Sequence, residues 1–237
     1  MKAIVLCGGL GTRLGALTRN MPKPMLPVAG RPFIGHVLDR LCVPGIDGIV
    51  LAAGFAWKQL HGFVGEYWRT LPVQYCIEPH AMGTGGAIAL AMHQLDLPEA
   101  IIVNGDTLFD IDLLFFLKHS AQQLRASTLT WMALRAVEDC ARYGRVETDS
   151  QGYIRSFGEK GRSGPGLING GIYRQQRTPL ERFGTKPFSF ETDYLATDCA
   201  RLQMVGIALT GYFIDIGIPA DLLRANTDLS PSTKSLS

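Results

Sequence analysis

The chain has 237 residues, of which 46% are hydrophobic and 19% are charged, and its formal net charge is +2. A chain of this length buries roughly 70% of the surface that its unfolded form exposes, so we expect it to fold without a disulfide framework or a structural metal. The small net charge argues against a nucleic-acid-binding protein and against a protein that binds anionic membrane surfaces.

The cysteines and the N-terminus indicate the compartment. The five cysteines form no C-x-x-C pair, which is typical of reduced thiols in the cytoplasm. The apolar run in MKAIVLCGG is too short for a signal peptide. No stretch approaches the ~18 apolar residues of a membrane span. We therefore expect a cytoplasmic protein without a membrane partner; homo-oligomers are compatible with the sequence, but no heptad specifies one.

The first 135 residues alternate short apolar runs with segments of helical periodicity. The predicted strands are 2–7, 47–53, 73–77, 100–103 and 128–134, and the predicted helices are 31–41, 56–67, 87–94 and 111–124. A glycine-rich loop is expected at 8–21 and a turn at 83–86. This alternation predicts an α/β fold with a mostly parallel sheet between helices. Ligands of such sheets bind beyond the carboxyl ends of the strands.

After residue 135 the regular alternation of predicted strands and helices ends. A hairpin is predicted from 145–148 and 153–157, further strands at 167–173 and 204–209, and a last helix at 219–226. We expect one domain over residues 1–228, with an α/β half (1–135) and a smaller mixed half (136–228) that faces it across a cleft. The Ser/Thr/Pro-rich residues 229–237 are expected to form a flexible tail.

The most informative segment is GGLGTRL at 8–14, followed by PKP at 22–24. Glycines let the backbone approach a ligand, and successive N–H groups can form a nest for an anion. Arg13 and Lys23 add positive charge, which suits a triphosphate. The segment lacks the Gly-Lys-Ser/Thr of a P-loop, and Leu14 stands where a dinucleotide-binding fingerprint needs a small residue. A tight turn that uses glycines for geometry alone is the simpler alternative.

Two carboxylates are candidate metal ligands. Asp106 follows a predicted strand, and Asp215 lies in the apolar run FIDIG. A carboxylate among apolar neighbours is costly unless it is paired or bound to a metal. Mg²⁺ is usually held by one or two carboxylates plus substrate phosphates. A turn or an ion pair explains either residue alone, but the two together favour a metal. The pair Asp110 and Asp112 is instead interpreted as a helix start.

The glycine loop with PKP resembles the signature of the sugar nucleotidyltransferases, also called NDP-sugar pyrophosphorylases. The resemblance extends through PKPMLPVAGRP (22–32), GTGGAI (83–88), NGDTLFD (104–110), LINGGIY (167–173) and GYFIDIGIP (211–219). Within the family, these runs are most similar to D-glycero-α-D-manno-heptose 1-phosphate guanylyltransferases. The resemblance implies a Rossmann-like αβα sandwich with a sugar-binding subdomain.

The resemblance also implies roles for individual residues. It places Mg²⁺ on Asp106 and Asp215, and it makes Arg13, Lys23 and Asp106 catalytic. The nucleotide-binding residues would be Leu6, Gly8, Gly9, Gly11, Thr12, Arg13, Lys23, Glu78, Gly83, Thr84 and Gly105. The sugar-phosphate-binding residues would be Tyr143, Gly144, Glu159, Lys160, Asn169 and Gly170.

The expected reaction transfers a nucleoside monophosphate, GMP from GTP, to a sugar 1-phosphate and releases pyrophosphate. Because the attacking phosphate oxygen is already anionic, no Ser/His or Cys/His pair is required. One alternative is uridylyl transfer, or transfer of another nucleotide, to a different sugar 1-phosphate. Another is a non-catalytic homologue that binds nucleotide sugar, which would be expected to lack one of the four charged residues. A metal-dependent glycosyltransferase would instead rely on Asp110 and Asp112.

Overall fold

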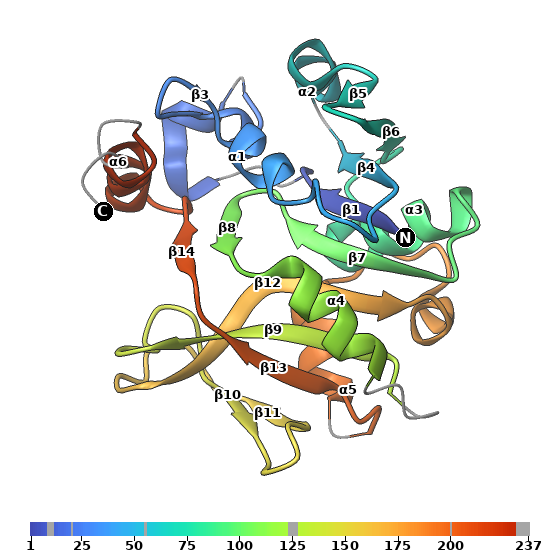
Figure 1. Cartoon of the computed structure of the whole chain (residues 1–237), viewed down its shortest axis with the longest axis vertical. Helices are drawn as coiled ribbons and strands as arrows, with labels where there is room; N and C mark the ends of the chain where they lie inside the picture. Colours follow the sequence, from blue (N-terminus) through green and yellow to red (C-terminus); the bar gives the residue numbers. More distant parts are fainter. Residues whose placement is uncertain (9–11, 20, 55, 123–127, 200, 231–237) are drawn as a thin grey trace.

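We describe a computed structural model of the chain, which covers residues 1–8, 12–19, 21–54, 56–122, 128–199 and 201–230. For residues 12, 13 and 16 only the backbone is described. In the described residues, the main sheet has 10 strands in the order β11-β10-β12-β7-β1-β4-β6-β5, with β9 pairing to β12 and β13 to β9 (Figure 1).

The centre of the sheet is parallel. Strand β1 (Lys2–Leu6) pairs in parallel with β4 (Gly48–Ala53) and with β7 (Glu99–Asn104), and β4 pairs in parallel with β6 (Leu71–Ile77). A short strand, β5 (Tyr67–Trp68), closes this side in antiparallel pairing with β6. The carboxyl ends of β1, β4, β6 and β7 therefore meet at one edge of the sheet.

The second half extends the same sheet with mostly antiparallel strands. Strand β12 (Gly166–Gln176) pairs with both β7 and β9 (Thr130–Val137), and β9 pairs in parallel with β13 (Val205–Leu209). The predicted hairpin is present as β10 (Val146–Thr148) and β11 (Ile154–Phe157).

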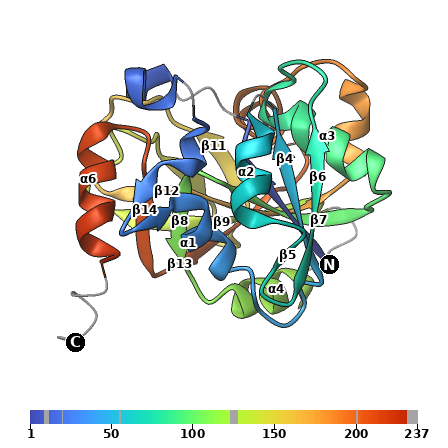
Figure 2. The same ribbon diagram turned by 90° about the horizontal axis from the view of Figure 1, so that it is seen from above.

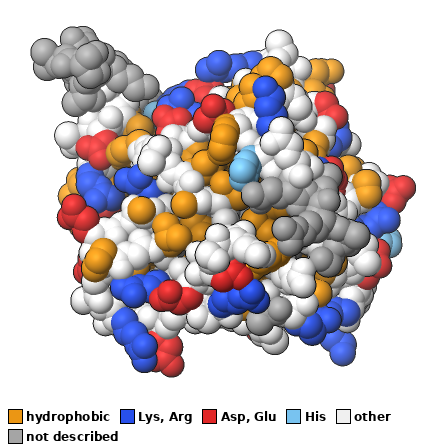
Figure 3. All heavy atoms as spheres, turned by 60° about the horizontal axis from the view of Figure 1, so that its bottom comes forward, with side chains coloured by type: hydrophobic (Ala, Val, Ile, Leu, Met, Phe, Trp, Pro, Cys, Tyr) orange, Lys and Arg blue, Asp and Glu red, His pale blue; other side chains and the backbone are white. Residues whose placement is uncertain are grey.

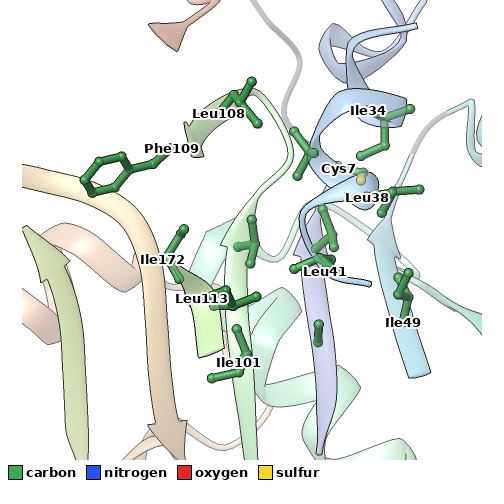
Figure 4. Close-up of a cluster of buried hydrophobic side chains, with 14 of the residues drawn as sticks. Cys7, Ile34, Leu38, Leu41, Ile49, Ile101, Leu108, Phe109, Leu113 and Ile172 are labelled. Atoms are coloured by element: carbon green, nitrogen blue, oxygen red, sulfur yellow. The ribbon is translucent and has the colours of Figure 1, made fainter. Parts of the chain in front are cut away.

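Helices cover both faces of the parallel strands. Successive residues of a strand point to opposite faces, so each face contributes apolar side chains to its own cluster. Ala3 and Val5 of β1 face a cluster that includes α1 (Phe33–Asp39), α2 (Trp57–Val64) and α4 (Leu113–Gln122). Figure 4 shows part of this cluster, with Cys7 near α1. Ile4 faces the other cluster, which includes α3 (Gly83–Gln94). The predicted α/β sandwich with a parallel centre is confirmed.

In the described part of the chain, three short helical elements follow β12, and residues of the first two belong to the same apolar cluster as α3. They are η3 (Thr178–Phe183), the π-helical turn η4 (Phe190–Leu195) and α5 (Ala196–Asp198). The last helix, α6 (Pro219–Asp228), lies on the opposite side of the molecule from α3 (Figure 2). Among the helices within the described ranges, none has the length and apolar character that a bilayer crossing requires. Lys/Arg and Asp/Glu side chains are interspersed on the face seen in Figure 3.

The structure differs from the expected elements at two glycine-rich segments. Residues 83–86, predicted as a turn, form the first turn of α3, because the carbonyl of Phe188 accepts from the N–H groups of Gly85 (3.0 Å) and Gly86 (3.3 Å). The predicted loop 8–21 contains a 3-10 segment, η1 (Thr12–Thr18). The contact with Phe188 joins segments about a hundred residues apart, and a 3-10 segment is short, so neither leaves a periodic pattern in the sequence.

A two-stranded ribbon was not predicted from the sequence. Strand β8 (Thr107–Asp110) pairs in antiparallel fashion with β14 (Tyr212–Asp215), and Thr107 lies opposite Asp215. The ribbon is visible in Figure 1, where β14 runs beside β8. It joins segments about one hundred residues apart and positions both candidate metal ligands. The predicted helix start is confirmed for Asp112, whose Oδ1 accepts from the backbone N–H of Phe115 at 2.9 Å. Asp110 instead ends β8 and pairs with Arg40 at 2.9 Å.

Candidate active site

The candidate site lies at the carboxyl edge of the parallel strands. Asp106 follows β7, and Asp215 ends β14 in the neighbouring ribbon. The N–H of Ile216 donates to the carbonyl oxygen of Asp106 at 3.1 Å, so the backbones at the two aspartates are tied together. The fold therefore brings together two carboxylates that are separated by more than a hundred residues.

Lys23 joins the two carboxylates. Its Nζ lies 2.6 Å from Oδ2 of Asp106 and 3.3 Å from Oδ1 of Asp215. The side chain of Lys23 is only 12% exposed. Lys23 begins a short 3-10 turn, η2 (Lys23–Met25), which is flanked by Pro22 and contains Pro24. Because proline fixes its own φ angle, the two prolines restrict the backbone on both sides of Lys23 and thus limit where its side chain can point.

Gly105 allows the end of β1, the turn that carries Lys23 and the segment that carries Asp106 to approach one another closely. Its N–H donates to the carbonyl of Leu6 at 3.0 Å. A Cβ at this position would lie 2.6 Å from that oxygen and 3.3 Å from Cγ of Pro24. No larger residue fits there without displacing the strand end or the lysine turn. Gly105 thus brings the glycine loop, the lysine and Asp106 to one edge.

The donor set fits a hard divalent cation. Oxygen atoms of one or two carboxylates, completed by phosphate oxygens, are what Mg²⁺ prefers. A Cβ on Gly217 would lie 3.0 Å from Oδ1 and 3.2 Å from Oδ2 of Asp215 and 3.3 Å from Nζ of Lys23, so glycine leaves the space beside these groups open. Within the described ranges, no group of three or more His, Cys, Asp or Glu residues could hold a metal. Protein carboxylates would therefore supply only part of the coordination.

Glu78 connects the glycine loop to helix α3. Its Oε2 accepts from the backbone N–H of Met82 at 2.9 Å, and its Oε1 faces Gly8. Thr84, also predicted to bind nucleotide, accepts from the N–H of Phe190 at 2.9 Å. Gly83 packs against the carbonyl of Phe188. Glu78 and Gly8 therefore lie together at the site edge, whereas Gly83 and Thr84 contact the segment 188–190.

Part of the glycine loop lies outside the described residues. This applies to Gly9 and Gly11, and to the side chains of Thr12 and Arg13. Their assignment to nucleotide binding and catalysis stays a prediction.

Cys7, just before the glycine loop, is buried. This burial, together with the nearby charge of Asp106, raises the pKa of its thiol well above the usual range. The thiol stays protonated at neutral pH, which agrees with its interpretation as a small packing residue.

Some of the predicted sugar-side residues lie near one another. Gly144 lies beside Lys160, where a Cβ would be 3.8 Å from Cγ of the lysine. The ring of Tyr143 meets the ring of Phe213 edge to face at 5.6 Å. Burial raises the pKa of the Tyr143 hydroxyl, an effect that the Asp215 carboxylate adds to and that Arg142 opposes, so the hydroxyl stays a donor.

Gly170 reaches this group through aromatic contacts, whereas Asn169 bonds within its own strand. Asn169 donates from Nδ2 to Oη of Tyr173 at 2.6 Å and accepts from the N–H of Gly171 at 2.9 Å. Gly170 packs against the ring of Phe109, which in turn meets Phe213 edge to face at 5.6 Å. Asn169 is thus fixed by its own strand, β12. Glu159 and Lys160 are exposed.

Arg142 is a site residue that was not predicted from the sequence. Its Nη2 lies 3.3 Å from Oδ2 and 3.3 Å from the carbonyl oxygen of Asp215, and its Nη1 pairs with Asp221 of α6. Only its place directly before Tyr143 could have drawn attention to it. An arginine in a loop carries no periodic signal, and its partners lie more than seventy residues away.

Comparisons with known proteins agree with this geometry. Residues 2–232 match the family described as "Nucleotidyl transferase". The D-glycero-α-D-manno-heptose 1-phosphate guanylyltransferase of Aneurinibacillus thermoaerophilus is 36% identical over 97% of this chain and 98% of its own. The enzyme of the same name from Campylobacter jejuni is 37% identical over 93% of this chain and 96% of its own.

A solved structure shows the same fold. The crystal structure of HddC from Yersinia pseudotuberculosis complexed with GMP-PN aligns with a TM-score of 0.83 and 31% identity, covering 97% of this chain and 99% of the other. The resemblance found in the glycine loop and the PKP segment is therefore confirmed over nearly the whole length. The chain belongs to the nucleotidyl transferase family.

Proposed function

We propose that this chain transfers GMP from GTP to a sugar 1-phosphate, specifically D-glycero-α-D-manno-heptose 1-phosphate, and releases pyrophosphate. The observation that carries the proposal is Lys23 between Asp106 and Asp215, at 2.6 and 3.3 Å, at the edge where the glycine loop begins. Two near-full-length relatives bear the guanylyltransferase name, which supports the choice of base and sugar.

The reaction requires charge neutralisation and alignment rather than proton transfer. An oxygen of the sugar phosphate attacks the α-phosphorus of GTP, the bond from that phosphorus to the bridging oxygen breaks, and pyrophosphate leaves with the electron pair. Since the nucleophile is already an anion, no general base is needed. Catalysis would then come from positioning and electrostatic stabilisation.

Each residue of the site has a proposed role in this scheme. Lys23 orients the triphosphate and Arg13 stabilises the departing pyrophosphate, while Lys160 holds the sugar phosphate and Glu159 accepts from sugar hydroxyls. Asp106 and Asp215 would hold Mg²⁺, and its charge would offset the repulsion between the two anionic substrates. Tyr143, Gly144, Asn169 and Gly170 would line the sugar pocket.

The nucleotide side and the sugar side also suggest a division of the chain. We propose that residues 1–135 bind the nucleotide and residues 136–228 bind the sugar, as one nucleotidyltransferase domain followed by a tail. We further propose a cytoplasmic enzyme whose product, GDP-heptose, serves capsule, S-layer or lipopolysaccharide glycans. The free cysteines Cys7, Cys42, Cys76, Cys140 and Cys199 support the reducing compartment.

The test measures pyrophosphate release with each of the four nucleoside triphosphates, Mg²⁺ and a panel of sugar 1-phosphates that includes the heptose phosphate. We expect release with GTP and the heptose phosphate. Release with another pair, such as UTP and an amino-sugar phosphate, would keep the chemistry and reject the specificity. Absence of release from folded protein that still binds GTP would favour a non-catalytic nucleotide-sugar-binding homologue.

A further inference from the structure

Asp215 is held from two sides. Lys23 contacts Oδ1 at 3.3 Å, on the side of the site that Asp106 shares. Arg142 contacts Oδ2 and the backbone carbonyl oxygen of Asp215, both at 3.3 Å. The arginine thus restrains both the side chain and the main chain of this residue. The two oxygens of the carboxylate have different partners, so the orientation of the group is defined.

The other end of the guanidinium is anchored in α6. Its Nη1 pairs with Oδ2 of Asp221, whose side chain is only 10% exposed. Oδ1 of Asp221 pairs with Arg224 at 3.3 Å. Helix α6 is itself fixed to the N-terminal half, because Oδ1 of Asn226 accepts from the N–H of Ala29 at 2.9 Å. Arg142 therefore connects Asp215 to a largely buried carboxylate of α6, and α6 is itself hydrogen-bonded to the N-terminal half.

The loop that carries Arg142 is also part of the sugar side. The N–H of Gly161 donates to the carbonyl of Ala141 at 2.7 Å, and the N–H of Gly158 donates to that of Arg145 at 2.7 Å. The segment 158–161, which contains Lys160, is thus hydrogen-bonded to residues on either side of Arg142. The backbone of the loop that carries Arg142 is therefore tied to the segment that carries Lys160.

The donors of Arg142 are largely used by these protein contacts. Nη2 binds two oxygens of Asp215 and Nη1 binds Asp221, while the guanidinium carbon lies 5.1 Å from the centroid of the Tyr143 ring. A planar fork can hold two carboxylates at once, whereas a lysine ammonium is a single point charge on a flexible stem. This geometry favours holding a ligand residue in place over direct binding of phosphate.

We propose that Arg142 is a positioning residue that fixes Asp215 as a metal ligand and couples it to the sugar-phosphate segment. The inference rests on the proposed function, because it assigns Asp215 to the metal. Partners that orient metal ligands in this way are typically worth 10–100-fold in metal affinity or activity. Arg142 acts through Asp215 and does not touch the reacting atoms.

The test must separate orientation from charge. Arg142→Met alone would leave Asp215 and Asp221 less neutralised, which by itself attracts a cation. The double variant Arg142→Met/Asp221→Asn removes one positive and one negative charge, so the net charge of the site is unchanged. The matched control is Arg177→Met/Asp96→Asn. That pair, at 2.7 Å, lies at the opposite end of β7, and Arg177 is 29% exposed compared with 30% for Arg142.

Four quantities are measured: the Kd for Mn²⁺ by electron paramagnetic resonance with GTP bound, kcat, KM for the sugar phosphate, and the melting temperature. We expect the double variant to bind Mn²⁺ about ten-fold more weakly and to lose about ten-fold or more in kcat, with a much smaller change in KM. The control should match the wild type. Arg142→Lys, which keeps the charge, should not restore kcat, and it serves as the readout where the double variant does not fold.

Other outcomes overturn the proposal. If the folded double variant retains the Mn²⁺ affinity and kcat of the control, Arg142 is only a structural ion pair. If KM for the sugar phosphate alone rises, Arg142 binds phosphate directly. If wild-type protein releases no pyrophosphate with any substrate pair, the proposed function fails, yet the Mn²⁺ comparison still decides the role of Arg142. Wild-type protein that binds no Mn²⁺ overturns the inference whatever its turnover.

Discussion

The two sides of the candidate site differ in how their lysines are held. Lys23 is 12% exposed and lies between two carboxylates. Lys160 is exposed, and within the described residues no ion pair joins it to a partner. A charge that is already oriented contributes mainly to the chemical step, because little reorganisation is needed in the transition state. A charge that must be ordered on binding contributes mainly to affinity. Removal of Lys23 should therefore lower kcat, and removal of Lys160 should raise KM for the sugar 1-phosphate.

The largest effect is expected from Asp106→Asn. The change removes one of the two carboxylates that Lys23 contacts, and with it the charge that would hold the metal. A metal's charge stabilisation is worth several kcal/mol, so we expect kcat to fall by about 10³-fold. Steady-state pyrophosphate release is the measurement, and circular dichroism checks the fold.

The matched control is Asp112→Asn, which changes the N-terminal cap of α4. We expect it to retain turnover, since asparagine is as good a cap as aspartate. A loss of turnover in Asp112→Asn with normal turnover in Asp106→Asn would reverse the metal assignment. It would favour the alternative metal site at Asp110 and Asp112.

Lys23→Met should lower kcat by about 10²-fold, because it removes one preorganised charge from the triphosphate. The same change should strengthen the binding of Mn²⁺, since Lys23 occupies an oxygen of each carboxylate. Isothermal titration with Mn²⁺ and steady-state kinetics would show these opposite effects. Weaker Mn²⁺ binding in a folded Lys23→Met variant would contradict the proposed competition.

Lys160→Ala should raise KM for the sugar 1-phosphate by about ten-fold and leave kcat within a factor of a few, because an exposed charge-assisted contact is of moderate strength. The wild-type KM should increase with salt, and the KM of the variant should be less sensitive. Lys118→Ala, on the exposed surface of α4, is the control. A fall in kcat without a change in KM would place Lys160 in the chemical step and remove the contrast with Lys23.

The smallest effect is expected from charges that only support the fold. Asp39 is tied to Arg31 at 2.6 Å, to Arg69 at 2.9 Å and to Nε1 of Trp68 at 3.1 Å. Partial burial raises the pKa of the Asp39 carboxyl, but the hydrogen bond and charge of Arg31, with Arg69 and Trp68, outweigh burial and hold it below its usual value.

Because the pKa of Asp39 is lowered in the folded state, its stabilisation is present above the unfolded pKa and is lost as pH falls through the folded pKa. Asp39→Asn should reduce the free energy of unfolding at pH 7 by about 1 kcal/mol or less and flatten its decline in acid, with turnover unchanged. Urea unfolding between pH 7 and pH 3 is the measurement. An unchanged pH dependence would show that the ion pairs of Asp39 contribute nothing.

The strands of the parallel core and most helices were predictable from local patterns. The runs at 2–7, 47–53 and 100–103 became β1, β4 and β7 with small shifts at their ends. The pattern is local because both faces of these strands are buried, which requires continuous apolar residues. The ribbon of β8 and β14 was missed because each strand is only four residues long and pairs with a distant partner.

The candidate site divides in the same way. Lys23, Asp106 and Asp215 could be identified from their residue types and neighbours, and the family from the glycine loop with PKP. Their meeting point could not, because it depends on the contact of Gly105 with Leu6 and on the ribbon that brings Asp215 beside Asp106. The role of Arg142 could be recognised only from its contacts in the folded chain.

The sequence by itself determined the fold class, the family and the charged groups available for catalysis, because apolar periodicity and a glycine-rich signature are local properties of the chain. Tertiary structure alone decided which charges lie within contact distance and which oxygen of Asp215 faces Lys23 and which faces Arg142. These relations depend on strand pairing and helix packing across more than seventy residues. No local pattern specifies them, since ion pairs impose no spacing on the sequence.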